Sequence, residues 1–131
     1  MKYMLLMMTT DIGHPPITEW EPADVRAHIE FMAKFTQGLV TSGELVDGQG
    51  LALPDDAKIV TARDGEPAAV TDGPFPESKE FLAGYWIVDV DDPDRALEIA
   101  AEASASPGPG GIRLNHPIEV RRIMDAPPVD L

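Results

Sequence analysis

The sequence predicts an α+β domain in which two helices cover one face of an antiparallel sheet. Three patterns indicate this class. Residues 2–9 form an apolar run, residues 81–89 alternate between two faces, and residues 23–42 repeat apolar side chains at three- and four-residue spacing. These are the signatures of a buried strand, a sheet strand and an amphipathic helix. The length of 131 residues fits one domain with one core.

The first half of the chain reads as a strand, a loop and a helix. The loop at residues 11–22 contains Gly13 and three prolines. The helix over residues 23 to about 42 has Pro22 in its first turn and Gly43 at its end. Its apolar stripe, widened by Phe31 and Phe35, consists of Val25, Ile29, Met32, Ala33, Thr36, Leu39 and Val40.

The middle of the chain is rich in turns. Residues 45–53 contain Gly48 and Gly50 and predict a glycine-broken strand or a bulge. Residues 59–62 and 68–71 are two short strands around an Asp-Gly turn at residues 63–66, which is typical of a hairpin. Residues 71–76, with two prolines, predict a tight turn.

The second half repeats the order of strand, helix and strand. Asp92 and Pro93 have the character of an N-cap and a first helical residue, and a second helix follows them. Its apolar positions are Ala96, Leu97, Ile99, Ala100 and Ala103. We expect a flexible surface loop at residues 104–111, a last strand at 117–124 and a flexible C-terminal tail at 125–131, so that the single domain spans residues 1–124.

Without the inserted hairpin, the order is βαββαβ, the ferredoxin-like unit in which both helices lie on one face of the sheet. In residues 81–89, Trp86 and Val88 point to one face, and Tyr85 and Ile87 point to the other. Both faces are apolar, yet the helices cover only one of them. We therefore expect a homodimer whose sheets pack face to face.

The charge balance argues against several partners. Lys and Arg number 10, and Asp and Glu number 23, so the net charge is −13. Such a chain repels phosphate backbones and acidic lipids, so we expect neither nucleic acid nor a membrane as a partner. There is no cysteine, which excludes disulfides, thiolate zinc sites and cysteine nucleophiles. The short apolar run at residues 1–8 favours a first strand over a signal peptide, and a cytoplasmic location is expected.

Several segments carry a resemblance to a known family. They are Thr-Asp-Gly-Pro-Phe at residues 71–75, the charged residues at 77, 79 and 80, and Leu-x-Gly-Tyr at residues 82–85. Together with residues 2–6 and 119–121, they resemble the DGPF-domain proteins of the YCII-related family over nearly the whole chain. The resemblance implies a dimeric α+β barrel built on the ferredoxin-like unit. Two departures, Arg122 in place of the usual proline and a longer insert at residues 107–115, affect the C-terminal edge.

The resemblance also implies an active site containing a histidine and an aspartate. His28 on the first helix matches the histidine, and Asp47 is a candidate for its partner. An imidazole beside a carboxylate can move protons near neutral pH. The alternative for His28 is a half-buried helix residue whose ring bonds a backbone carbonyl.

Within the DGPF-like segment, Asp72 has two interpretations. It could take a proton or orient a ligand beside a pocket, or its side chain could cap the backbone of its own turn. Phe75 is expected to fill the core. The charges of Glu77, Lys79 and Glu80 either face solvent or line a cleft, and in the second case Lys79 is a substrate-binding residue.

Glu119 and Arg121 lie on the same face of the last predicted strand. They could form an ion pair at a dimer interface. Alternatively, Arg121 could anchor a substrate, because arginine grips a carboxylate through two parallel hydrogen bonds. Tyr85, on a sheet face, is a further candidate for substrate binding.

No metal and no cofactor are expected. The three histidines, at positions 14, 28 and 116, do not have metal-ligand spacing. Residues 108–111 are glycine-rich but lack the lysine and Ser/Thr of a phosphate-binding loop.

Two functional hypotheses follow, and they leave open whether the protein is an enzyme. In the first, a cleft between sheet and helix binds a small organic molecule, anionic if Arg121 anchors it, and His28 acts as acid and base with Asp72 or Asp47 orienting it. In the second, the protein is a non-catalytic sensor of a small ligand or a regulatory accessory protein. The resemblance suggests transcription control by alternative sigma factors as the context for the second role.

Overall fold

The computed structural model describes residues 1–10, 15–73 and 80–125. Its main elements follow the predicted order of strands and helices. They are β1 (Lys2–Thr10), α1 (Pro22–Ser42), β2 (Leu45–Gly50), β3 (Lys58–Arg63), β4 (Glu66–Asp72), β5 (Glu80–Asp89), α2 (Pro93–Ser104) and β6 (Ile118–Arg122). Short 3₁₀ turns occur at Ile17–Glu19, Pro54–Asp56 and Pro109–Gly111.

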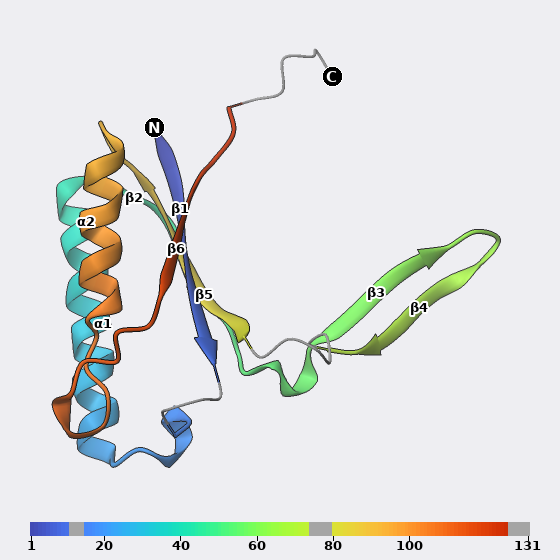
Figure 1. Ribbon diagram of the computed structural model, residues 1–131, viewed down its shortest axis with the longest axis horizontal. Helices are drawn as coiled ribbons and strands as arrows, with labels where there is room; N and C mark the ends of the chain where they lie inside the picture. Colours follow the sequence, from blue (N-terminus) through green and yellow to red (C-terminus); the bar gives the residue numbers. More distant parts are fainter. Residues whose placement is uncertain (11–14, 74–79, 126–131) are drawn as a thin grey trace.

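Four of the strands form one antiparallel sheet in the order β2-β5-β1-β6. Both helices lie on the same side of this sheet, as Figure 1 shows. This arrangement confirms the predicted ferredoxin-like α+β class. The remaining two strands, β3 and β4, pair only with each other and form a hairpin that projects away from the sheet (Figure 1).

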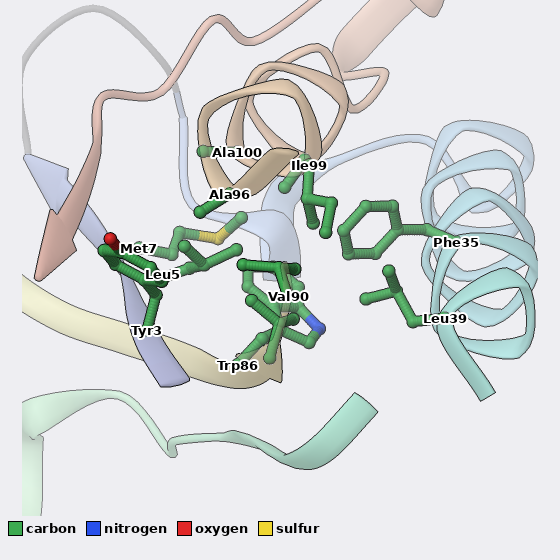
Figure 2. Packing of buried hydrophobic residues seen from close by; sticks show 12 residues of the cluster. Tyr3, Leu5, Met7, Phe35, Leu39, Trp86, Val90, Ala96, Ile99 and Ala100 are labelled. Carbon is green, nitrogen blue, oxygen red and sulfur yellow. The ribbon is translucent and has the colours of Figure 1, made fainter. Parts of the chain in front are cut away.

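The core fills the space between the sheet and the two helices (Figure 2). Alternate side chains of β1 and β5 point into it, as the strand patterns predict. Phe35 of α1 meets Trp86 of β5 edge to face, with ring centroids 5.3 Å apart. The buried residues are Tyr3, Leu5, Met7, Phe35, Leu39, Trp86, Val88, Val90, Ala96, Ile99, Ala100 and Ala103.

The helix ends form where the sequence places them. Pro22 is the first residue of α1, and Gly43 ends the helix in the left-handed conformation at φ 79°. Asp92 caps α2, because its side chain accepts a hydrogen bond of 3.1 Å from the backbone N–H of Arg95.

The buried stripe of α1 differs from the predicted one. Ile29 is 58% exposed and Val40 is also exposed, whereas Phe35 and Leu39 are buried. His28 is half-buried on the same side as Phe35 and Leu39. The helix therefore presents its aromatic side chains to the sheet, since burying a large ring removes more apolar area from water than burying an aliphatic side chain.

The loop after α2 is packed, in contrast to the flexible surface loop predicted for residues 104–111. Ser106 is fully buried, and its carbonyl accepts a hydrogen bond of 2.9 Å from the backbone N–H of Leu114. A bridge joins Pro107 to Arg113, and the side chain of Asp24 accepts a hydrogen bond from Gly110. These contacts fix the loop against the first turns of α1.

None of the helices in the described ranges is long and apolar enough to cross a membrane. The predicted tail lies beyond the described residues, apart from residue 125. The predicted turn at residues 71–76 is described only as far as Gly73, and both Thr71 and Asp72 belong to β4.

Candidate functional site

A cleft of about 1160 Å³ opens beside the N-terminal half of α1. One wall is α1, with His28, Met32 and Thr36, and another is the segment that leads into the helix, with Trp20. Strands β2 and β5 and the loop after β2 complete it. Ligand sites are concave and mostly apolar with a few polar groups, and this cleft has that character.

Glycines from β2 and β5 line the cleft and give it room. Gly48, Gly50 and Gly84 contribute backbone only. A Cβ at Gly48 would lie 2.9 Å from Cδ1 of Trp86, so only glycine lets β2 approach this ring without displacing it. The glycine-broken strand that the sequence predicts therefore forms part of the cleft.

The His28 ring is held at one nitrogen. Its Nδ1 lies 3.0 Å from the carbonyl oxygen of Pro107, and Trp20 meets the ring edge to face at 5.5 Å. A carbonyl oxygen can only accept, so Nδ1 must carry the proton in this contact. In the neutral ring, Nε2 then has a free lone pair, and no described residue is hydrogen-bonded to it.

The contact between His28 and Pro107 is the one that the structural alternative for His28 predicts, a bond from the ring to a backbone carbonyl. It does not exclude a chemical role. A histidine whose Nδ1 is fixed by a carbonyl presents Nε2 in a defined direction, which is how catalytic and metal-binding imidazoles are commonly oriented.

Asp47 pairs with Tyr85 rather than with His28. The Tyr85 hydroxyl donates a hydrogen bond of 3.1 Å to Oδ2 of Asp47. This bond, together with burial, raises the pKa of Tyr85 above its ordinary value, because losing the phenol proton would place two negative charges side by side. Tyr85 borders the cleft.

Asp72 is the last residue of β4, at the base of the projecting hairpin. Its carboxylate is 86% exposed and forms an ion pair of 2.6 Å with Lys58. The next residue, Gly73, lines the cleft, and Asp72 does not. The candidate substrate-binding residue Lys79, with Phe75 and Glu77, lies outside the described residues. Glu80 is the first residue of β5.

Arg121 and Glu119 lie on the face of the sheet that the helices leave open. Arg121 pairs in register with Met4, and Glu119 pairs with Leu6, whereas the neighbouring Leu5 points into the core. The two charged side chains are 3.8 Å apart, and Arg121 is 71% exposed. A single chain thus holds His28 and Arg121 on opposite sides of the sheet, and neither Arg121 nor Asp72 lines the cleft.

Two cleft residues were not predicted to bind a ligand. Trp20 follows the proline-rich loop, and its indole N–H donates a hydrogen bond of 2.9 Å to the carbonyl of Pro15. His116, considered above only as a metal ligand, also lines the cleft. An aromatic residue in a polar, proline-rich segment was the available signal for Trp20. In the described part of the chain, no three His, Asp or Glu side chains gather closely enough to hold a metal ion.

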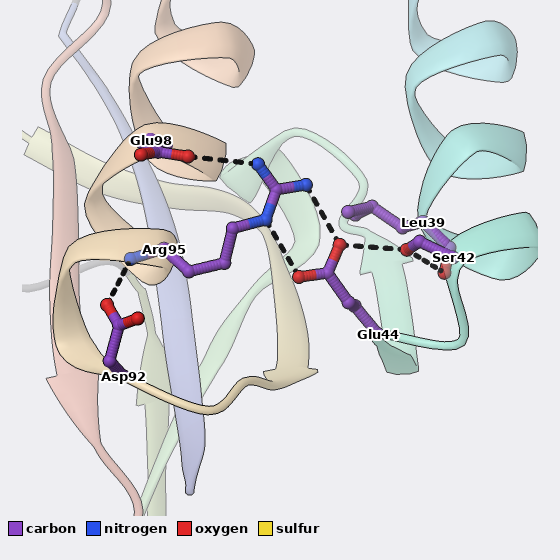
Figure 3. A network of polar contacts seen from close by, with 6 residues as sticks. All are labelled: Leu39, Ser42, Glu44, Asp92, Arg95 and Glu98. Atoms are coloured by element: carbon purple, nitrogen blue, oxygen red, sulfur yellow. Dashed lines mark hydrogen bonds and ion pairs between the residues drawn. The ribbon is translucent and has the colours of Figure 1, made fainter.

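A second polar cluster joins the C-terminal end of α1 to α2 (Figure 3). Nε and Nη2 of Arg95 each donate a hydrogen bond of 2.8 Å to the carboxylate of Glu44, and Nη1 donates one of 3.2 Å to Glu98. The Ser42 hydroxyl lies 2.8 Å from Oε1 of Glu44.

Charge pairing explains the titration of this cluster. The hydrogen bonds from Arg95, opposed by burial and assisted by Ser42, lower the pKa of Glu44 from 4.5 to about 2. Glu44 in turn raises the pKa of Arg95. Asp91, Asp92 and Asp94 lie around the same acidic hollow of about 520 Å³. The cluster fastens the segment between α1 and β2 to α2 and has a structural role.

The chain matches a known family model. The family model described as the YCII-related domain matches residues 1–108, which include α1, the cleft-forming strands and His28. No curated protein matches the chain significantly.

Proposed function

The chain belongs to the YCII-related family, and we propose that its cleft beside α1 binds a small organic molecule on which His28 acts as an acid and base. The observation that carries this proposal is the contact of Nδ1 with the Pro107 carbonyl. It leaves Nε2 with the lone pair on a residue that lines the cleft beside α1.

The chemistry follows from the tautomer. Nε2 accepts a proton from an acidic C–H or O–H group of the bound molecule, whose bonding electrons stay on the molecule. The ring becomes an imidazolium, and its Nδ1–H bond to the carbonyl strengthens because the donor is now charged. Returning the proton to another atom of the same molecule completes an isomerisation that needs no co-reactant.

In this proposal the Pro107 carbonyl orients His28, the role that the sequence suggested for Asp47 or Asp72. Asp47 is engaged with Tyr85, and Asp72 with Lys58. Arg121 lies across the sheet from His28, so it does not anchor the ligand within one chain.

Deuterium exchange tests the chemistry without requiring net turnover. Compounds that raise the unfolding temperature are first found by a thermal-shift screen, and each is then incubated with the protein in heavy water and followed by NMR. Wild type is expected to introduce deuterium at a carbon atom of at least one bound compound. A ligand that binds and is returned without exchange would contradict the proposal and favour a sensor of small molecules.

Two variants make the test specific. In His28→Asn the amide nitrogen can still donate to the Pro107 carbonyl, but no group replaces Nε2, so binding should persist while exchange disappears. Arg26→Asn is the control. Arg26 precedes His28 by two residues in α1 and is exposed, so this variant should leave exchange unchanged. If His28→Asn exchanges as fast as wild type, His28 has a structural role alone.

We further propose that the protein is a homodimer formed through the open face of the sheet. Met4 pairs with Ile87 and Leu6 pairs with Tyr85 on this face, and all four side chains are half-buried. The helices cover the other face only (Figure 1). A central apolar surface without a cover is normally an interaction site.

Light scattering coupled to size-exclusion chromatography tests the dimer. We expect a mass of twice 14.2 kDa at micromolar concentration. Leu6→Glu, in the middle of the open face, should give monomers, whereas Ile29→Glu on the exposed side of α1 should not. A monomeric wild type would contradict the proposal.

A further inference from the structure

We infer that the cleft beside α1 selects an uncharged or cationic ring compound and rejects anions. This inference rests on the proposed function, since it names the class of molecule on which His28 would act. It concerns the charge and shape of the cleft, which can be measured whether or not chemistry occurs.

The charged groups around the cleft favour a neutral or cationic ligand over an anion. Among the described residues that line it, the only carboxylate is Asp55, and none is a lysine or an arginine. Lys58, at the base of the adjoining hairpin, is already paired with Asp72. With a net charge of −13 on the chain, the surroundings oppose a bound anion.

The lining also favours a ring. Aromatic side chains from two separate parts of the chain border the cleft, namely Trp20 before α1 and both Phe81 and Trp86 of β5. Leu51 and Leu53, in the loop after β2, line it while remaining exposed. Aromatic faces and uncovered aliphatic side chains bind flat apolar molecules through area burial and ring packing. The cleft volume of about 1160 Å³ slightly exceeds the usual size of ligand pockets, about 300–1,000 Å³, so one or two rings fit.

The polar groups set the remaining requirement. The lone pair on Nε2 of His28 accepts a hydrogen bond, and Thr36 offers a hydroxyl group on the same wall. A ligand with a phenol, enol or N–H donor would satisfy Nε2, and the same donor group is the acidic group that the proposed chemistry requires.

Three phenols that differ only in the charge of a short side chain test the inference. They are 4-hydroxyphenylacetamide, tyramine and 4-hydroxyphenylacetate, which are neutral, cationic and anionic. Binding is measured by isothermal titration calorimetry with the full-length protein at about pH 8, above the usual titration range of imidazoles. The amide and the amine are expected to bind at least about tenfold more tightly than the acetate.

A charge placed on the cleft wall provides the matched variant. Leu53 is 44% exposed and lines the cleft, whereas Leu97 is 55% exposed on α2 and does not. Leu53→Lys should raise affinity for the acetate by about tenfold and lower it for tyramine. Leu97→Lys adds the same charge and should change neither.

Each result decides one point. Acetate binding as tight as amide binding would overturn the charge selection, and equal effects of the two lysine variants would place the binding elsewhere. Absence of binding by all three phenols up to solubility would overturn the ring class. Binding with the expected order but without deuterium exchange would leave this inference standing and overturn the acid–base role of His28.

Discussion

Replacing Glu44 with glutamine should destabilise the protein at neutral pH and much less in acid. Glu44 is 17% exposed and receives two hydrogen bonds of 2.8 Å from Arg95, which hold its pKa at about 2 instead of 4.5. A difference of that size corresponds to at most about 3 kcal/mol of folding free energy. Because solvent screens a partly exposed pair, we expect about 1–2 kcal/mol.

The direction of the pH dependence follows from the lowered pKa. A carboxylate whose pKa is lower in the folded state stabilises the fold above its ordinary pKa of 4.5, and this contribution is lost as the pH falls toward 2. The difference in unfolding free energy between wild type and Glu44→Gln should therefore be full at neutral pH and begin to shrink below about pH 4.5.

Urea denaturation followed by circular dichroism measures this difference at about pH 7, 5, 4 and 3. Glu98→Gln is the matched control, because Glu98 binds the same arginine at 3.2 Å but is largely exposed, and it should cost less than about 0.5 kcal/mol. A gap between wild type and Glu44→Gln that stays constant from neutral to acid pH would refute the reasoning. So would a Glu98→Gln variant as unstable as Glu44→Gln.

Three further results are expected. Gly43→Ala should lower the unfolding free energy by about 1 kcal/mol, because Gly43 has a φ of 79°. Gly38→Ala, inside α1 with open space around it, should instead raise the unfolding free energy by about 0.5–1 kcal/mol. Equal effects of the two substitutions in denaturant unfolding would contradict the capping argument. Asp47→Asn should lower the pKa of Tyr85 toward its ordinary value in an ultraviolet titration, and an unchanged curve would show that Asp47 is not the cause. Leu5→Ala should cost about 2–5 kcal/mol, since Leu5 is fully buried. A loss below about 1 kcal/mol, as small as that of many surface substitutions, would argue against the core as described.

The order of elements was predictable because each carries a local signal. Alternation in β5 placed Trp86 and Val88 in the core, and both are buried. Asp92 and Gly43 cap their helices by interactions within a few residues of their own positions. Such signals need no knowledge of distant parts of the chain.

The arrangement around the candidate site was predictable only in part. His28 was identified by resemblance, and the glycines of β2 by their breaking of the strand pattern. The partner of His28 could not be predicted, because Pro107 is 79 positions away in a loop that the composition marked as flexible. The same holds for Glu44 and Arg95, which are 51 positions apart.

The class of fold and the order of the helices and strands follow from the sequence alone, as does the net charge of −13. Packing between separate elements sets which side of α1 faces the sheet and which nitrogen of His28 stays free, and it places Arg121 across the sheet from His28. The physical reason is the range of the interactions. Periodicity and capping act between neighbours in the chain, whereas a cleft and its charge depend on how separate elements pack.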